Sequence, residues 1–204
     1  MICEANIVET ACSSVFLQRH GESETNVSGC FTCRRLEPGL TANGKEAISR
    51  KAEYYRQAGI RRIVSSPSRR TLETAGILSE SLGLLVETDD DLLEVHIGSL
   101  EGKSEHDPEL LDFFLNRMQN ILDGSDEGFP GGESGIELRE RVKRLSLRYI
   151  LTESQNTLLI GHAAIFAILM GIASEQKHPI AKLFLPRSGS ARFCLIKREW
   201  EVFG

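Results

Sequence analysis

Two histidines in this chain each follow a short apolar run that has the length of a buried strand. His20, within Arg19-His20-Gly21, follows the run 14–18, and His162 follows the run 157–161. Ligands of open α/β sheets bind just beyond the carboxyl ends of the strands, so we expect both histidines to reach one crevice. A neutral imidazole is a nucleophile near pH 7, and a guanidinium matches the geometry of phosphate oxygens. The arrangement therefore points to phosphoryl chemistry.

The elements that must position these histidines alternate between strands and helices. We expect strands at 14–18, 62–65, 84–87, 157–160, 192–196 and 200–203, and helices at 41–58, 68–82, 109–122, 136–152 and 163–174. Such alternation is typical of a largely parallel sheet covered by helices on both faces. The predicted fold class is α/β: a three-layer α/β/α sandwich with a mostly parallel central sheet and a small helical insertion over the site.

Further sequence blocks accompany the first histidine in a fixed order. They are Glu22–Asn26, Gly39–Ala47, Ser65–Ala75, Leu92–Gly102 and Pro130–Ser134, followed by Arg141 and Gly161-His162. As a set, from about Val15 to His162, these blocks closely resemble the histidine phosphatase superfamily, in its phosphoglycerate-mutase-like branch. The resemblance implies a phosphomonoesterase that works without a cofactor. The blocks offer no carboxylate cluster with the spacing of a Mg²⁺ site, so we expect no metal either.

The resemblance implies a role for the first histidine and for two arginines. His20 would attack phosphorus and form a phosphohistidine, which splits one difficult step into two. Arg19 and Arg70 would bind the phosphoryl oxygens, because guanidinium groups pair with phosphate and keep their charge. Arg70 occupies the arginine position of the family's S-S-P-x-x-R block, whereas Arg69 occupies a variable position and is expected to lie in solvent.

Two further residues complete the implied machinery. His162 matches the family's second pocket histidine and would donate a hydrogen bond to a phosphoryl oxygen as an imidazolium. Glu94, in the pattern Glu94, Gly98, Glu101 and Gly102, is the candidate general acid, which would protonate the leaving oxygen and then act as base on water. His96 lies two residues further on and would be the next residue to examine.

Other residues in these blocks have more than one interpretation. Ser23 and Asn26 could supply neutral hydrogen bonds to phosphoryl oxygens, or they could cap the loop after His20. Ala163-Ala164 stands where the family usually has Gly-Gly, and the two methyl groups would narrow that wall of the pocket. This difference from the family bears on the identity of the substrate more than on the phosphoryl step.

Three functions are compatible with these residues. We expect a phosphatase acting on a small phosphorylated substrate, because the stretch 103–129 has seven acidic and two basic residues, a net charge of −5 that would repel a bisphosphorylated glycerate. A phosphoglycerate-type mutase is the first alternative. A non-catalytic phospho-ligand or protein-binding module on the same fold is the second, and loss of His20 or Glu94 would have been its signature.

Length and composition set the remaining expectations. The 204 residues, with 41% hydrophobic and 26% charged residues, predict one domain over 1–204, with a flexible tail at 1–13 and an insertion or lid at 103–129. The net charge of −5 argues against a nucleic-acid partner. The longest apolar stretch, 163–173, is too short to span a bilayer, and no secretory signal is evident, so we expect a cytoplasmic protein with no membrane partner. The sequence leaves open whether the protein forms a homodimer.

The five cysteines are an odd number with no disulfide-scaffold spacing. Cys30 and Cys33 form a single C-x-x-C pair, which supplies only half of a zinc site, so incidental thiols in a loop are expected there.

Overall fold

A computed structural model describes residues 14–151, 155–174, 177–194 and 199–203. The strands are β1 (Ser14–Arg19), β2 (Arg62–Ser65), β3 (Val86–Thr88), β4 (Thr157–Gly161), β5 (Ser190–Cys194) and β6 (Glu199–Phe203). The α-helices are α1 (Glu24–Ser28), α2 (Ala42–Ser49), α3 (Ala52–Gln57), α4 (Arg69–Leu82), α5 (Pro108–Leu122), α6 (Gly135–Leu145) and α7 (Ala163–Ala173).

The six strands form one sheet in the order β3-β2-β4-β1-β5-β6. The four strands β3, β2, β4 and β1 run parallel, whereas β5 is antiparallel to β1 and β6 is antiparallel to β5. Every residue of β4 is buried, as is usual for a parallel strand covered on both faces. The predicted α/β fold class with a mostly parallel sheet is confirmed.

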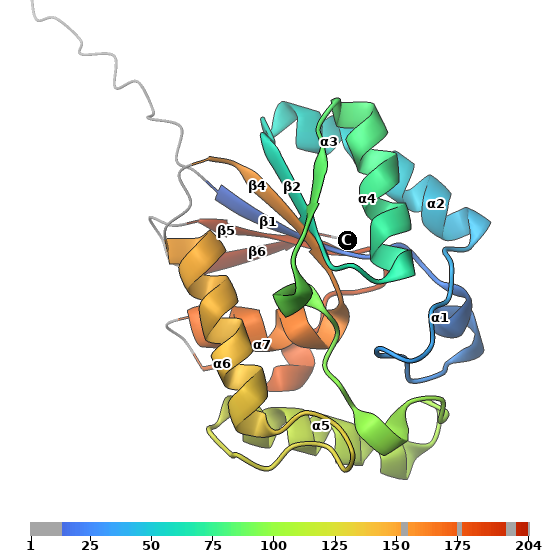
Figure 1. The fold of residues 1–204 in the computed structure, drawn as a ribbon, viewed down its shortest axis with the longest axis vertical. Coiled ribbons are helices and arrows are strands. Elements are labelled where there is room, and N and C mark those ends of the chain that lie inside the picture. The colour runs from blue at the N-terminus through green and yellow to red at the C-terminus, as the bar shows by residue number, and fades with distance from the viewer. Residues whose placement is uncertain (1–13, 152–154, 175–176, 195–198, 204) are drawn as a thin grey trace, which may run out of the picture.

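The side chains of the central strands divide between two cores. Successive side chains of a strand point to opposite faces of the sheet, so neighbouring apolar residues reach different layers. Phe16, Ile63 and Leu158 belong to the core under α2, α3 and α4, and Leu17, Val64 and Leu159 belong to the core under α5, α6 and α7. Figure 1 shows the sheet between these two groups of helices. A continuous apolar run is therefore what each central strand needs.

Helix ends follow the sequence with two differences. The helix expected over 41–58 is interrupted at Arg50 and Lys51, where the N–H of Lys51 bonds the carbonyl of Ile48 in a tighter, 3₁₀-type turn. The helix expected over 136–152 ends as α6 at Leu145 and continues as a π-helix over Ser146–Leu151, in which the adjacent Tyr149 and Ile150 are both buried. Helix α1 was not predicted, because its five residues are too few for a periodic pattern.

The stretch 103–129 lies beside the carboxyl edge of the sheet. Asp107 caps α5, where its side chain accepts hydrogen bonds from the N–H groups of Glu109 and Leu110. Helix α5 packs against α6 and α7, and Phe114 stacks on Phe129 with ring centroids 5.7 Å apart. The predicted helical insertion is thus present, and its apolar face is joined to the larger core.

Some expectations lie outside the described residues. They concern the tail 1–13 and the turn between the last two strands at 195–198. The organisation of 1–204 as one domain stays a prediction. Across the described ranges, no helix combines the length and the apolar character that crossing a membrane requires.

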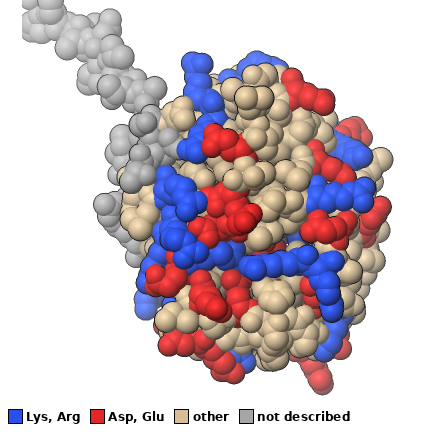
Figure 2. Space-filling view, viewed as in Figure 1, with Lys and Arg blue, Asp and Glu red and all other residues tan. Residues whose placement is uncertain are grey.

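Charged side chains of both signs are interspersed on the face shown in Figure 2. Several of them pair: Arg144 of α6 and Arg148 of the following π-helix both contact Asp91, and Arg148 also pairs with Asp89. The charges on this face are therefore largely matched locally.

Candidate active site

The pairing of β1 with β4 brings the two histidines together. Arg19 pairs with Gly161 in the parallel register, so the next residue after each strand is a histidine at the carboxyl edge of the sheet. The N–H of His20 donates to the carbonyl of Gly161 over 3.0 Å. The ring centroids of His20 and His162 lie 5.4 Å apart, with 62° between the ring planes.

The His20 ring presents Nε2 as its unprotonated nitrogen. Nδ1 lies 2.8 Å from the carbonyl oxygen of Gly21, and because a carbonyl only accepts, Nδ1 must carry the hydrogen. Burial of the ring, followed by the charges of Arg70 and Arg19, holds the pKa of His20 well below its usual range. A neutral imidazole with a lone pair on Nε2 is the form that attacks phosphorus.

His162 is fully buried beside His20. Its Nε2 lies 2.9 Å from the hydroxyl of Ser66, and its Nδ1 has no hydrogen-bond partner among the described residues. Burial, then the charge of Arg70 and the His20 ring, hold the pKa of His162 well below its usual range. The protein by itself therefore favours a neutral His162 over the predicted imidazolium, because two guanidinium groups already supply positive charge there.

Arg19 and Arg70 each keep one buried nitrogen unpaired. Arg19 donates from Nη1 to the carbonyl of Leu185 over 2.8 Å, and Arg70 donates from Nη2 to the carbonyl of Cys33 over 3.1 Å. Within the described part of the chain, Nε of Arg19 and Nη1 of Arg70 are buried without partners. Burial lowers the pKa of both side chains, and the nearby Glu94 opposes that shift. Unpaired buried donors are costly, so their presence here indicates an anion site.

Glu94 reaches this pocket from the loop after β3 and is tied to the start of α7. Its Oε1 accepts from the N–H groups of Val95 at 2.8 Å and Ile165 at 3.0 Å, and its Oε2 accepts from Ala164 at 3.2 Å. The carboxyl group therefore meets backbone amides rather than only the apolar neighbours that the sequence offers.

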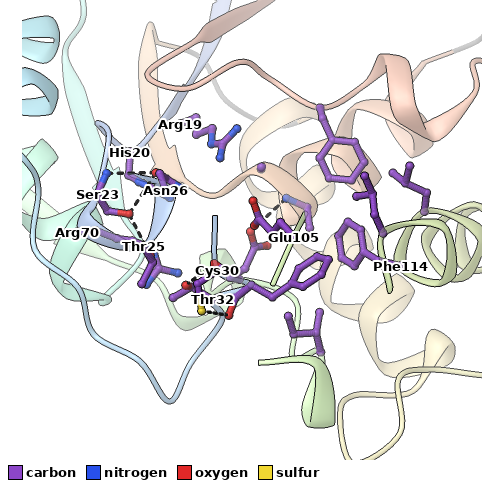
Figure 3. A pocket seen from close by; sticks show the side chains of 18 of the residues that line it. Arg19, His20, Ser23, Thr25, Asn26, Cys30, Thr32, Arg70, Glu105 and Phe114 are labelled. Carbon is purple, nitrogen blue, oxygen red and sulfur yellow. Dashed lines mark hydrogen bonds between the residues drawn. The ribbon is translucent and has the colours of Figure 1, made fainter. Parts of the chain in front are cut away.

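Ser23 and Asn26 bond to each other and also line the pocket. Oδ1 of Asn26 accepts from both the backbone N–H and the hydroxyl of Ser23, each at 3.1 Å. This capping box begins α1 and turns the chain away from His20. Figure 3 shows both side chains beside His20. The loop-capping interpretation is thus present in the structure, and contact with phosphate stays a prediction.

These residues share one cavity of about 350 Å³. Arg19, His20, Ser23, Asn26, Arg70 and Glu94 line it, and His162 lies behind His20. The remaining wall comes from α5, the segment 30–32 and the start of α7, and includes Ala163 and Ala164. The two alanine methyl groups therefore border the pocket, as their place after His162 predicted.

Sequence reasoning missed several residues of this cavity. Glu105 comes from the insertion, Thr25 from α1, Thr32 from the loop after α1, and Phe184 from a segment near the C-terminus. Glu105 is one of seven acidic residues in 103–129, so nothing in the sequence distinguishes it from the others. Only the packing of the insertion against the sheet edge selects it.

Two neighbours of the predicted site residues lie elsewhere. His96 lines a separate cleft with Arg34 and Arg141, so it is not a substitute for Glu94. Arg69 points into solvent and pairs with Glu73 over 2.8 Å, as its variable position predicts. The Arg69 side chain therefore lies in solvent, whereas the side chain of the adjacent Arg70 lines the cavity.

The buried carboxyl group of Glu101 holds the loop that contacts Arg70. Its Oε1 accepts from the N–H groups of Cys33, Arg35 and Leu36, and its Oε2 accepts from the Cys33 thiol at 2.9 Å. Burial and this hydrogen bond raise the pKa of Cys33 to about 12. Cys33 is therefore a protonated structural thiol, and neither it nor Cys30 is in a disulfide.

The blocks that supply this pocket match one protein family along most of the chain. A family model described as the histidine phosphatase superfamily (branch 1) matches residues 15–197. The chain belongs to the histidine phosphatase superfamily. The family suggested by the sequence blocks is thereby confirmed, and the crevice at the β1–β4 edge is the place where histidine phosphatase chemistry has to be sought.

Curated relatives of this histidine phosphatase carry different names. A probable phosphoglycerate mutase of Proteus mirabilis is 34% identical over 163 residues, covering 76% of this chain and 72% of the relative. A putative phosphoserine phosphatase of Hydrogenobacter thermophilus is 32% identical over 170 residues, covering 79% and 81%. A bifunctional protein of Mycobacterium tuberculosis is 32% identical over 168 residues, and the match covers 79% of this chain but only 44% of that protein.

Solved structures show the same fold. A mycobacterial glucosyl-3-phosphoglycerate phosphatase in complex with VO₃ superposes with a TM-score of 0.74 at 24% identity, covering 94% of this chain and 97% of the other. A mycobacterial hydrolase superposes with a TM-score of 0.76 at 20% identity, covering 95% and 97%. At these identities the likeness establishes the histidine phosphatase fold alone.

Proposed function

We propose that this chain is a phosphatase that hydrolyses a phosphomonoester through a phosphohistidine on His20. The observation that carries the proposal is the set of buried nitrogens at one end of the cavity. Nε of Arg19, Nη1 of Arg70 and Nδ1 of His162 have no partners among the described residues, and they surround a histidine that is held neutral. A phosphoryl group would accept from the two guanidinium nitrogens, and from Nδ1 of His162 in the tautomer whose Nε2 accepts from the Ser66 hydroxyl.

In the first step, Nε2 of His20 attacks phosphorus in line with the ester oxygen. The N–P bond forms as the P–O bond breaks, and Glu94 delivers a proton to the leaving oxygen. Arg19 and Arg70 stabilise the charge that spreads over the equatorial oxygens, with His162 as a further donor. Ser23 and Asn26 border the same end and would add neutral hydrogen bonds.

In the second step, water attacks the phosphohistidine and the N–P bond breaks. Glu94, now a carboxylate that Val95, Ala164 and Ile165 help to stabilise, accepts a proton from the water. Inorganic phosphate leaves, and His20 recovers the lone pair on Nε2. The hydrogen bond from Nδ1 to the Gly21 carbonyl keeps the ring in one orientation through both steps.

Two observations favour a phosphatase over a mutase. The insertion carries a net charge of −5, and one of its carboxyl groups, Glu105, lies in the cavity wall. A doubly phosphorylated intermediate, which a mutase must retain, would be repelled by both. The mutase alternative is supported by the Proteus mirabilis relative, whose name is probable phosphoglycerate mutase. Release of inorganic phosphate without any isomerised product distinguishes the two functions, and absence of turnover would indicate a binding module.

The reaction is expected to need no metal. The described residues hold no group of three or more His, Cys, Asp or Glu side chains arranged to bind an ion. Hydrolysis of p-nitrophenyl phosphate should therefore keep its rate, within about twofold, after treatment with EDTA. The same sample with added Mg²⁺ serves as the control. Activity that disappears with EDTA and returns with Mg²⁺ would contradict the mechanism.

Substitution of Glu94 should matter in proportion to how poor the leaving group is. An alkyl alkoxide needs a proton to depart, whereas p-nitrophenolate hardly does, and general acids contribute about 10²–10⁴-fold. Glu94→Gln should slow phosphorylation of His20 by an alkyl phosphate at least about 10²-fold and by p-nitrophenyl phosphate far less. Single-turnover label formation isolates this step from the later use of Glu94 as a base. Equal losses with both substrates would remove Glu94 as the acid.

We also propose, in general terms, the compartment of the enzyme and the size of its substrate. Cys30 and Cys33 are free thiols, which fits a reducing compartment such as the cytoplasm, and the pocket fits a small phosphorylated substrate. A homodimer stays a prediction that the mass of the protein in solution would test.

A further inference from the structure

The cavity is divided into a cationic end and an apolar end. Beyond the phosphoryl-binding end, the wall is made largely of Phe31, Ile97, Leu111, Phe114, Leu115 and Phe184. Figure 3 shows Phe114 on the side of the pocket away from His20 and Ser23. A phosphomonoester placed with its phosphorus at His20 would therefore direct its leaving group towards these apolar side chains.

One charged side chain faces this apolar end. Glu105 lines the cavity, and its position is fixed by its backbone N–H, which donates to the carbonyl of Gly29 over 2.7 Å. The preceding Ser104 pairs with Cys30 in an isolated bridge. The Glu105 carboxylate is half-buried, and its charge, after that of Glu94, partly opposes the lowering of the Arg19 pKa by burial. Among the described residues it has no hydrogen bond or ion pair of its own.

Within the described residues, the cavity wall offers no third arginine or lysine for a second anionic group. Arg19 and Arg70 are the guanidinium groups that line it, and both belong to the phosphoryl end. A carboxylate on the leaving group would therefore lie between an apolar wall and the Glu105 carboxylate. Burying an unpaired carboxylate is costly, and a like charge adds to that cost.

We infer that the substrate is the phosphate ester of an apolar alcohol or phenol without a second anionic group, and that Glu105 is the residue that excludes anionic leaving groups. The inference rests on the proposed phosphatase function and deepens it. An ammonium group on the leaving group is tolerated or favoured, because it would pair with Glu105. Phosphoglycerates and other carboxylated phosphates are poor substrates.

Three matched esters test the charge preference. Propyl phosphate, 3-aminopropyl phosphate and the phosphate ester of 3-hydroxypropanoate share a three-carbon chain and differ in the charge at its end. We expect kcat/KM for the carboxylated ester to be at least about tenfold below that of propyl phosphate. Glu105→Gln should bring the kcat/KM values of the carboxylated ester and of propyl phosphate to within about twofold of each other. Glu109→Gln is the matched control, since Glu109 is an exposed residue of the same insertion that does not line the cavity.

A series of straight-chain alkyl phosphates tests the apolar end. Each added methylene that enters the pocket should raise kcat/KM about fourfold until the chain fills the cavity. Leu111→Ser should flatten this dependence, and it should do so without unfolding the protein, because Leu111 is 37% exposed. Leu85→Ser, at a residue that is 91% exposed and outside the cavity, is the control and should leave the series unchanged.

Binding separates this inference from the proposed function. Butylphosphonate and 3-phosphonopropanoate cannot be hydrolysed, so calorimetry measures their affinity even if no ester is turned over. We expect the carboxylated phosphonate to bind at least about tenfold more weakly, and Glu105→Gln to remove the difference. Absence of turnover together with this pattern would refute the phosphatase alone. Equal turnover or equal binding of the neutral and anionic compounds, unchanged by Glu105→Gln, would refute the substrate class.

Discussion

His20→Ala is expected to abolish both hydrolysis and covalent labelling of the protein. With a phosphorylated substrate, the unsubstituted chain should acquire a stoichiometric phosphoryl label that is labile in acid and stable in base. The variant should acquire none, and kcat/KM should fall at least about 10⁴-fold, because the path through a covalent intermediate is lost. The contact of Nδ1 with the Gly21 carbonyl orients the ring of His20, the proposed nucleophile, and alanine retains no group that could take this role.

His96→Ala is the matched control for this experiment. His96 is another histidine of the chain, but it lines a separate cleft with Arg34 and Arg141. Its removal should leave labelling and turnover within about threefold of the starting values. His20→Asn, which retains more of the side-chain volume, guards against loss of folding, and thermal unfolding should be cooperative for every variant. A label that persists in His20→Ala would show that another residue is the nucleophile.

Arg70→Ala is expected to lower kcat/KM at least about 10²-fold, as loss of one preorganised donor to a transition-state oxygen does. Arg70 is 1% exposed, and its unpaired Nη1 is available to a phosphoryl oxygen. Arg69→Ala should change kcat/KM less than about threefold, because the Arg69 side chain is 63% exposed and pairs with Glu73 outside the cavity. Equal losses in the two variants would contradict the assignment of the helix register.

The two arginine variants should also differ in stability in an informative way. Burial lowers the pKa of Arg70, which means that the folded protein disfavours the charge that the unfolded chain carries freely. Loss of this charge should therefore offset part of the packing lost with the side chain. We expect Arg70→Ala to lower the midpoint of thermal unfolding by less than truncation of a large core side chain does. Its activity should nevertheless fall further than that of Arg69→Ala. Arg70→Lys, which keeps the charge without the planar fork, should recover only part of the activity.

The electrostatics of the pocket explain why two histidines are paired with two arginines. A dianionic phosphoryl group needs compensating charge, and the guanidinium groups supply it without a proton equilibrium near pH 7. The same charges keep the imidazoles neutral, since they are the main causes, after burial, of the lowered pKa of His20 and His162. The proposed nucleophile, His20, is thereby kept unprotonated beside the charge that would attract a phosphorylated substrate.

The sequence by itself was sufficient to determine the sheet and the meeting of the histidines. A short apolar run is typical of a strand buried on both faces, and strands of a parallel sheet end at one edge, so the runs before His20 and His162 predicted two histidines in one crevice. The family blocks also separated Arg70 from Arg69, because consecutive residues of a helix point about 100° apart and only one can face the sheet edge.

Only the tertiary structure decided how the rest of the pocket is built. Glu105 is one acidic residue among seven in its stretch, and the packing of α5 against α6 and α7 is what places it in the cavity wall. His96 follows Glu94 by two residues, yet the loop directs it into another cleft. Glu94 itself is held by amides from α7, seventy residues away along the chain. Contacts of this kind join segments with no periodic relation in sequence, so local patterns determine the strands and the order of the motifs, whereas the walls of the pocket depend on how distant segments pack.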